Sequence, residues 1–317
     1  MSEIEQEVKN RNIRLTPIRR YHHIEPTNGK SRIIGIESVK QQILDYVAAL
    51  ALESFLDARI GYYQVASVRG KGQLFAARSV KRWVRDSTYW VHIDVRKCYP
   101  SIKHDVVMGI LSKHIKSDDV LYLCRTLLST YGGGLEIGSF FSLRMAQLVL
   151  SYGYHHVESL HKERRGSKIA LVDHQLWYMD DAIIMSDSKR DLRMAVRSLS
   201  RYMRNHLGLS IKPWKLCMVG DMEPVDIAGF VIRRSRTTIR SSIFIRARRS
   251  FRKYERNPNL AMARRVCSYW GWISNSDSLL FIERNNALNI KNDARNTVSE
   301  NARKRVMNEQ NTISNAT

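Results

Sequence analysis

The sequence predicts an α+β fold, and three observations support this class. Stretches with apolar residues at helical spacing, notably 39–59, 141–163 and 189–208, lie between short runs typical of β-strands, such as 31–36. The helices and strands do not alternate strictly, as a βαβ succession would require. The chain has 317 residues, of which 44% are hydrophobic, so it is long enough to bury a sizeable core.

Each element can be justified in order along the chain. A strand at 31–36 leads into an amphipathic helix over 39–59, and glycines near residue 70 predict a turn before a helix over 74–84. A strand begins at 89 and ends at a turn near Pro100. Further helices are expected at 105–115, 118–130, 141–163 and 189–208, the last ended by Gly208. Short strands are expected as a hairpin over 175–185 and at 209–211, 216–219 and 226–232.

The charge of the chain indicates a polyanionic partner. Lys and Arg total 52 against 30 acidic residues, which gives a net charge of +22. Nucleic acid is favoured over an anionic membrane, because no basic amphipathic helix with an aromatic face is evident. Residues 233–253 carry nine basic residues and no acidic one, interleaved with Ser, Thr, Ile and Phe, which favours phosphate contact over a merely solvated surface. The arginines expected to bind nucleic acid are Arg233, Arg234, Arg236, Arg240, Arg246, Arg248 and Arg249.

Targeting and redox features indicate a cytoplasmic protein. The sequence has no run of ~18 apolar residues and no apolar segment typical of a secretory signal at its start, so no membrane contact is expected. Its four cysteines are scattered without a CxxC pair, which favours reduced thiols over a zinc site. The last ten residues or so are polar and rich in Asn, so they are expected to be disordered.

Three aspartates stand where apolar neighbours predict strands. Asp94 lies in "VHIDV", and Asp180 and Asp181 lie in "WYMDDAII". Two adjacent aspartates that occur in isolation usually lie in a surface turn. Here the apolar flanks and a third aspartate in a similar setting favour a functional site. Buried carboxylates need a compensating cation, and carboxylates converging from separate strands are how a site for two Mg²⁺ ions is built. In a basic protein this arrangement suggests phosphoryl transfer on nucleotides.

These motifs together resemble a reverse transcriptase. "YMDD" at 178–181 follows "HIDVRKCYPSI" by ~80 residues, and "GKSRIIGI", "EIGSFFSLRMAQL", "LGLSIKPWKL" and "VDIAGFVI" stand in the order of the family's blocks. The resemblance runs from about Lys30 to Trp272. It implies a right-hand polymerase with fingers, a palm made of an antiparallel sheet plus helices, and a short helical thumb. It also implies an RNA-directed DNA polymerase, a nucleotidyltransferase that uses two Mg²⁺ ions.

The resemblance assigns roles to individual residues. Asp94, Asp180 and Asp181 would be the catalytic carboxylates and metal ligands, with Val95 offering a backbone carbonyl. Tyr99 would exclude the ribose 2′-OH of the incoming nucleotide. The other residues expected near the nucleotide are Lys30, Arg32, Ile137, Gly138 and Lys215.

The resemblance also divides the chain into parts. The expected parts are an N-terminal arm at 1–28, fingers at 29–86 and 107–141, a palm at 87–106 and 142–232, and a basic thumb with a polar tail at 233–317. Residues 1–28 fit an interaction arm or a solvated leader equally well. The stretch after the last palm block leaves room for a thumb and for no nuclease domain.

The fourth block distinguishes the kinds of reverse transcriptase. It reads "IGSFFSL", whereas most members have QGxxxSP and the diversity-generating retroelement enzymes typically have IGxxxSQ. Ile137 and Gly138 match the second pattern, and Leu143 matches neither. The favoured interpretation is therefore a bacterial defence-associated enzyme that copies a dedicated noncoding RNA. The alternatives are a diversity-generating enzyme of low fidelity, because Ile137 removes a polar contact to the base pair, and an RNA-binding scaffold on a polymerase fold.

The expected partners follow from this interpretation. They are a structured noncoding RNA template, the DNA product, deoxynucleoside triphosphates, and a companion protein or a second copy of the chain. The three aspartates and Tyr99 favour the enzyme over the scaffold, because a protein that only binds RNA does not need three buried acids.

Overall fold

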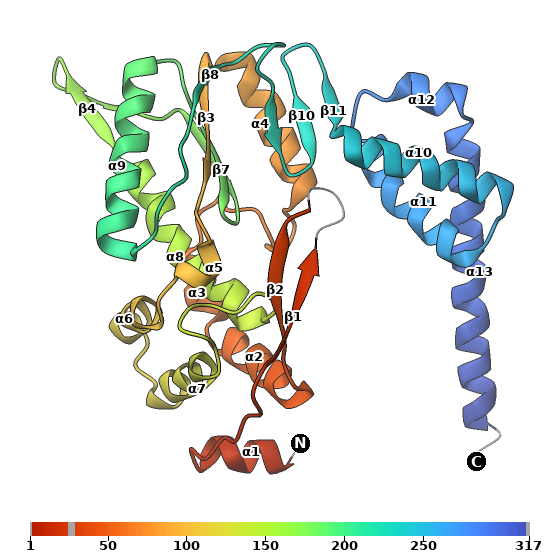
Figure 1. Cartoon of the computed structure of the whole chain (residues 1–317), viewed down its shortest axis with the longest axis horizontal. Coiled ribbons are helices and arrows are strands. Elements are labelled where there is room, and N and C mark those ends of the chain that lie inside the picture. The colour runs from red at the N-terminus through yellow and green to blue at the C-terminus, as the bar shows by residue number, and fades with distance from the viewer. Residues whose placement is uncertain (1, 25–28, 315–317) are drawn as a thin grey trace. The chain divides into compact units, whose positions relative to one another are not determined.

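The computed structural model describes residues 2–24 and 29–314. The chain divides into two compact units (Figure 1). Unit 1 consists of Met1–Ala76 and Arg85–Val219, and unit 2 consists of Ala77–Val84 and Gly220–Thr317. The C-terminal part of unit 2 begins at Gly220, and the division into fingers, palm and thumb stays a prediction.

A four-stranded antiparallel sheet forms the centre of unit 1. Its order is β6 (His174–Tyr178), β7 (Asp181–Ser186), β3 (Tyr89–Asp94) and β8 (Leu216–Met218). Successive side chains of a strand point to opposite faces. Val91 and Ile93 therefore enter the main core of unit 1, whereas His92 and Asp94 lie on the other face. β3 and β7 are the two central strands of this sheet. Asp94 and Asp181, at one end of these strands, therefore lie on interior strands of the sheet and not on its edge strands.

Two long helices pack together against this sheet. They are α8 (Phe140–Ser159) and α9 (Lys189–Leu207), each beginning after a serine whose side chain accepts a backbone hydrogen bond from the first turn. Gly208, with φ +66°, ends α9 as expected from the sequence. Gly153 lies against Trp177 of β6 and Leu199 of α9, so that the two helices and the sheet share one core.

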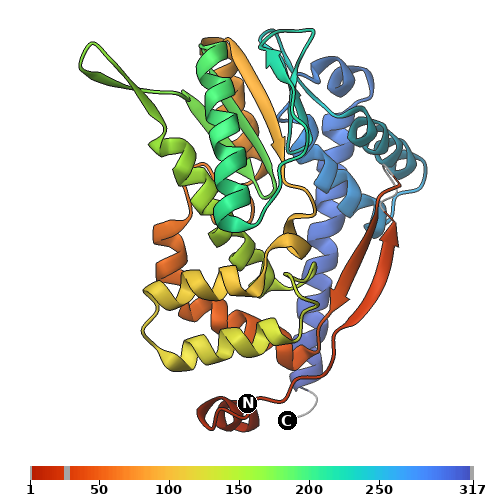
Figure 2. The ribbon, with the colours of Figure 1, turned by 60° about the vertical axis from the view of Figure 1, so that its left-hand side comes forward.

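The helix expected over 141–163 ends earlier, at Ser159. The chain enters a hairpin of β4 (His161–Arg164) and β5 (Ser167–Ala170), which projects from the end of α8 (Figure 2). Arg165 and Gly166 both have positive φ, the conformation of the two-residue turns that suit hairpins. The prediction for 161–163 was wrong because this turn, and not apolar spacing, decides the local structure.

The fingers elements expected from the sequence are present with different boundaries. The stretch 39–59 forms α2 (Val39–Ala51) and α3 (Glu53–Arg59), separated at the buried Leu52. Leu52 nevertheless continues the helical hydrogen bonds, because its N–H donates to Ala48 and its carbonyl accepts from Leu56. The other helices expected there correspond to α4 (Gln73–Asp86), α6 (His104–His114) and α7 (Asp118–Ser129), and a short helix, α5 (Cys98–Ser101), forms at the turn expected near Pro100 in the palm stretch. Residues 77–84 of α4 belong to unit 2.

Part of the stretch 1–28 is an ordered portion of unit 1. It contains α1 (Ser2–Lys9) and β1 (Arg19–Ile24), and β1 pairs along its whole length with β2 (Ser31–Ile36). Glu7 forms an ion pair with Lys40 of α2. Arg11 does the same with Asp119 of α7, at 2.6 Å. These contacts argue against a solvated leader for the described part, and residues 25–28 lie outside the described chain.

Unit 2 combines residues 77–84 of α4 with a small sheet and a set of C-terminal helices. The antiparallel sheet has the order β11 (Thr237–Ile239), β10 (Phe230–Ile232) and β9 (Val225–Ile227). The helices are α10 (Ser241–Arg256), α11 (Leu260–Ile273), α12 (Leu279–Arg284) and α13 (Ala287–Ser314), with α11 packed against both α10 and α13. The backbone at Gly229, with φ +87°, approaches Trp272 so closely that a Cβ would lie 2.4 Å from the indole ring.

Two further expectations differ from the structure. The tail expected to be disordered is helical as far as Ser314, and residues 315–317 lie outside the described chain. Buried Ala287, Ile290 and Ala294 fix one face of α13, and the chain then extends the helix because each added residue gains a hydrogen bond. The strand expected at 209–211 is reduced to a single bridge between Ile211 and Val95.

Two remaining expectations concern the redox state of the cysteines and the absence of a membrane-spanning segment. Cys98, Cys124, Cys217 and Cys267 are free thiols. Among the described helices, none has both the length and the apolar character that crossing a bilayer requires.

Candidate active site

Three aspartates meet at one end of the central sheet. Asp94, the last residue of β3, is the direct partner of Asp181, the first residue of β7. Asp180 and Met179 form the two-residue turn between β6 and β7, with Met179 in the left-handed region at φ +56°. The Val95 N–H donates to the Asp180 carbonyl at 3.2 Å, which fixes the turn against β3. The sheet register therefore brings the predicted carboxylates together.

The pKa of Asp180 reflects the nearby charges of the other two aspartates. Burial, and then the neighbouring charges of Asp181 and Asp94, raise the pKa of Asp180, whereas Arg32 of β2 acts in the opposite direction. Like charges close together disfavour ionisation, and a nearby cation favours it. The site thus contains mutually repelling carboxylates with the cationic Arg32 near them, and the role of Arg32 at the nucleotide stays a prediction.

Asp94 has a partner on one oxygen only. Its Oδ2 accepts a hydrogen bond from Lys212 Nζ at 2.6 Å, and this forms an ion pair. Its Oδ1 is buried and has no hydrogen-bond partner. Asp181 Oδ1 lies 3.2 Å from His92 Nε2, on the same face of the sheet as Asp94.

These features fit a divalent cation held by oxygen ligands. A buried carboxylate oxygen without a partner is costly, and a neighbouring carboxylate with a raised pKa indicates negative charge in excess. Hard cations such as Mg²⁺ prefer carboxylate and carbonyl oxygens. Among the described residues, however, no three His, Cys, Asp or Glu side chains form a ready-made metal cage. Lys212 is paired with Asp94, so its ammonium group occupies one side of that carboxylate.

Tyr99 stands beside the carboxylates. It lies in α5, which begins after Lys97 in a left-handed conformation at φ +46°. Burial, and then the charges of Cys98 and Asp180, raise the pKa of Tyr99, which places the phenol near the active-site charge. The Tyr99 carbonyl accepts from the Leu135 N–H at 2.9 Å, so this turn also supports the loop before α8.

Ile137 and Gly138 lie against β2, the strand that carries Arg32. The Gly35 N–H donates to the Ile137 carbonyl at 2.8 Å. Gly138 has φ +115°, and a Cβ there would lie 2.5 Å from the Gly35 carbonyl oxygen, so no larger residue fits without displacement. Lys30 immediately precedes the same strand. The strand therefore gathers four of the residues assigned to the nucleotide from the sequence.

Lys212 is a functional candidate that the sequence analysis missed. The analysis singled out Lys215 of "SIKPWKL", and the structure puts Lys212 on Asp94 and leaves Lys215 exposed ahead of β8. The Lys212 N–H also donates to the Asp94 carbonyl at 2.9 Å. The pairing of the segment after α9 with β3 selects Lys212, and no motif spacing reveals this pairing.

The basic stretch of unit 2 is ordered, and several of its arginines have structural partners. Arg240 forms an ion pair with Asp226 at 2.6 Å, and the Arg234 Nε donates to the Val84 carbonyl at 3.0 Å. Arg233 donates to the Asp221 carbonyl at 3.2 Å. The other arginines assigned to nucleic acid are exposed, at Arg236 in the turn before β11 and at Arg246, Arg248 and Arg249 on α10. Nucleic-acid binding by this stretch stays a prediction.

Comparison with known proteins identifies the family. Residues 23–232 match the family described as "Reverse transcriptase (RNA-dependent DNA polymerase)". That segment includes the three aspartates, Tyr99 and Lys212, and it covers well over half of the chain.

Two curated proteins of yeasts are similar over a shorter stretch. The "Uncharacterized 91 kDa protein in cob intron" of Schizosaccharomyces pombe is 26% identical over 129 residues, which is 41% of this chain and 16% of that protein. The "Putative COX1/OXI3 intron 2 protein" of Saccharomyces cerevisiae is 20% identical over 128 residues, 40% of this chain and 15% of that protein. The chain thus spans about a sixth of the length of these relatives.

A solved structure, an apo telomerase from Candida tropicalis, is 11% identical and superposes with a TM-score of 0.47, over 71% of this chain and 54% of that chain. The family match over 23–232 and the carboxylates at the end of an antiparallel sheet agree with each other. The chain belongs to the reverse transcriptase family of RNA-dependent DNA polymerases.

Proposed function

We propose that the protein is an active RNA-templated DNA polymerase that copies a dedicated noncoding RNA in a bacterial antiphage defence system. The observation that carries the polymerase part is the register of β3 and β7, which sets Asp94 opposite Asp181 with Asp180 in the adjoining turn. A structural role for three acids so close together is disfavoured, because burial and mutual repulsion raise the pKa of Asp180.

The proposed cofactor is a pair of Mg²⁺ ions. Asp94, Asp180, Asp181 and the Val95 carbonyl would hold them, and the unpartnered Asp94 Oδ1 supports this assignment. When bound, the ions would activate the primer hydroxyl and stabilise the pyrophosphate leaving group. Lys212 pairs with Asp94, and this lysine would have to leave that carboxylate oxygen for the ligand set to assemble.

The protein's own residues would position the nucleotide. Arg32 acts on the charge of Asp180 from β2, and so it would reach the triphosphate, with Lys30 beside it. Tyr99 lies near Asp180, where its ring would exclude a ribose 2′-OH. Ile137 and Gly138 would line the template and the nascent pair, supported by their contact with β2.

The proposed biological setting rests on the sequence of the fourth block and on charge. "IGSFFSL" shares Ile137 and Gly138 with the diversity-generating enzymes but has Leu143 where those enzymes have Gln. The net charge of +22 supports a structured RNA as a resident partner. The proposal places the protein in the bacterial cytoplasm with deoxynucleoside triphosphates, a DNA product, and either a companion protein or a second copy of the chain.

Nucleic acid that is purified with the protein from its native host tests this proposal. Sequencing of the bound RNA and DNA would compare the wild type with Asp180→Ala/Asp181→Ala. The proposal predicts one defined noncoding RNA in both samples and its complementary DNA only in the wild type. Equal RNA in both samples without DNA, at rest and during infection, would contradict the polymerase and favour an RNA-binding scaffold.

A further inference from the structure

One face of α9 carries a row of arginines that the active site does not use. We name it the arginine ridge, and its members are Arg190, Arg193, Arg197, Arg201 and Arg204. Their spacings of three and four residues keep them on one face of an α-helix. At 1.5 Å per residue the row extends for about 21 Å.

The ridge is exposed and contributes little to folding. All five arginines are solvent-exposed, whereas the opposite face of α9 buries Leu192, Val196, Leu199 and Met203 in the core. Asp191, the single acidic residue of this helix, is buried and paired with Lys162 of β4. Within residues 2–24 and 29–314, no ion pair joins Arg193, Arg197, Arg201 or Arg204 to a carboxylate.

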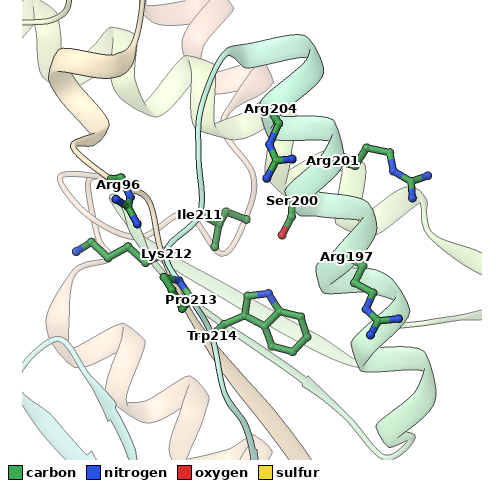
Figure 3. A pocket seen from close by; sticks show the side chains of 9 residues that line it. All are labelled: Arg96, Arg197, Ser200, Arg201, Arg204, Ile211, Lys212, Pro213 and Trp214. Atoms are coloured by element: carbon green, nitrogen blue, oxygen red, sulfur yellow. The ribbon is translucent and has the colours of Figure 1, made fainter.

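Two pockets lie along the ridge. The larger, of about 670 Å³, is bounded by α9 and by the facing segment Ile211–Trp214, with Arg96 on its far side (Figure 3). A second pocket of about 400 Å³ lies along the start of α9 and is lined by Lys189, Arg190, Arg193, Met194 and Arg197. The two pockets share Arg197, so they adjoin each other along the helix.

A phosphodiester backbone matches this surface. In B-form DNA the phosphates of one strand follow one another at about 3.4 Å of axial rise, so a ridge of about 21 Å is long enough to contact several phosphates of a nucleic-acid strand. Arginine binds phosphate through a planar fork of donors and is the preferred residue for such contacts. Trp214 is half-buried at the wall of the larger pocket and would offer a surface on which an unpaired base can stack. An acidic protein is the alternative ligand for this surface, but it would explain neither the position of Trp214 nor the regular row of positive charges.

We propose that the arginine ridge binds the phosphodiester backbone of a structured RNA. This surface borders the carboxylate site at Lys212, which lines the larger pocket and pairs with Asp94, but the ridge itself lies on α9. The identification of RNA as the ligand rests on the proposed function, whereas the recognition of phosphate rests on the ridge itself. The ridge would hold the RNA outside its copied segment, so that the template stays with the protein while the copied part moves through the active site.

Equilibrium RNA binding by the full chain, without nucleotides, tests the proposal. The test variant is Arg193→Gln/Arg197→Gln/Arg201→Gln, which keeps a good helix former at exposed positions. The control is Lys113→Gln/Lys116→Gln/Arg125→Gln, which removes three positive charges from exposed positions of α6, of the segment after it and of α7. The probe is an RNA hairpin with a single-stranded tail, titrated at several salt concentrations, and a DNA of the same sequence forms a second arm.

The ridge variant is expected to bind the RNA at least about tenfold more weakly than the control. The slope of log Kd against log salt should fall by about 2 to 3, because three phosphate contacts are lost. A similar loss with the DNA supports backbone recognition, and a loss confined to RNA adds recognition of the ribose. Equal affinities of the ridge variant and the control would overturn the proposal, as would an equal loss of binding to polyglutamate. Melting temperatures of both variants within about 2 °C of the wild type establish that folding is intact.

This readout does not depend on polymerisation. If Asp180→Ala/Asp181→Ala and the wild type both fail to make DNA but bind the hairpin through the ridge, the proposed function fails and the ridge stands. If DNA is made and the ridge variant binds like its control, the ridge fails and the proposed function stands.

Discussion

Lys212 and Lys215 both lie in the segment between α9 and β8, but their side chains have different neighbours. The ammonium group of Lys212 lies 2.6 Å from Asp94 Oδ2, whereas Lys215 is exposed at the start of β8. A cation held at the carboxylate of the reaction centre is well placed to move towards a developing negative charge when the ligand set assembles. We therefore assign Lys212 the role near the triphosphate that the sequence analysis gave to Lys215.

Single substitutions of the two lysines separate these assignments. Lys212→Met should lower the rate of single-nucleotide incorporation by about ten- to a hundredfold, because charge stabilisation at the reacting phosphate is lost. Lys215→Met, its matched control, should change the rate less than about threefold. Rapid-quench measurement of one incorporated deoxynucleotide gives both rates, and a larger loss for Lys215→Met would reverse the assignment.

Tyr99 supplies a second prediction at the residue scale. Its ring is half-buried near Asp180, so removing it should open space for a ribose 2′-OH. Tyr99→Ala should raise ribonucleotide incorporation relative to deoxynucleotide by at least about tenfold. Tyr99→Phe keeps the ring and should retain the wild-type preference. Competition assays that yield kcat/KM for both sugars provide the measurement, and an unchanged ratio in Tyr99→Ala would refute the gate.

Two buried carboxylates, Glu37 between β2 and α2 and Asp45 within α2, lie beside the start of α8. Glu37 Oε1 accepts a hydrogen bond from Gln41 Nε2 at 3.2 Å, and Asp45 Oδ2 accepts one from Ser139 Oγ at 2.6 Å. Burial, followed by the charge of Asp45, raises the pKa of Glu37 from 4.5 to about 8. The folded protein therefore holds a proton at neutral pH that the unfolded chain releases.

Because of this bound proton, the free energy of unfolding should fall as the pH rises. Because the pKa of Glu37 is higher in the folded state, its contribution is complete below pH 4.5 and is lost as the pH rises through about 8. The free energy of unfolding should decline by about 1.4 kcal/mol per pH unit between those values through this group. Glu37→Gln should flatten the decline, and it should melt at a higher temperature than the wild type at pH 8.5.

Glu53→Gln, at an exposed position of α3, is the matched control and should keep the wild-type dependence on pH. Thermal melts of the three proteins from pH 5 to pH 9 provide the comparison. Parallel curves for the wild type and Glu37→Gln would show that Glu37 is ionised throughout.

Sequence periodicity predicted those helices and strands whose buried residues repeat at the spacing of the secondary structure they form. It predicted β3, the β6–β7 hairpin and α9, whose apolar positions repeat at the spacing of their secondary structure. It did not predict β1, whose residues "RRYHHI" show no alternation and which is ordered by its pairing with β2. The end of α8 was missed because Arg165 and Gly166 form a hairpin turn in a stretch that continues a helical pattern.

The candidate site divides in the same way. Asp94, Asp180 and Asp181 could be found because charge between apolar residues is conspicuous in a sequence. The role of Lys212 depends on the bridge between Ile211 and Val95, a pairing between segments far apart in the chain that no local pattern encodes. The arginine ridge was missed because exposed arginines on an amphipathic helix are ordinary until the facing Trp214 and the pockets are known.

For the molecule as a whole, positive charge is the dominant property, and each compact unit carries its own concentration of it. Unit 1 has the arginine ridge on α9, and unit 2 has the exposed arginines of α10. Binding of a polyanion to either surface should depend steeply on salt. Asp94, Asp180 and Asp181 lie in unit 1, so the proposed chemistry belongs to this unit, whereas nucleic-acid binding by the arginines of unit 2 stays a prediction.

The central claim is that the carboxylates at the end of β3 and β7 carry out RNA-templated DNA synthesis. Primer extension on a defined RNA template, with the purified full chain, deoxynucleoside triphosphates and Mg²⁺, tests it most directly. The wild type should extend the primer, and Asp180→Asn should lower the rate at least about a hundredfold while binding the same primer–template with unchanged affinity. Extension by Asp180→Asn at the wild-type rate, or no extension by a wild type that binds the primer–template, would contradict the account.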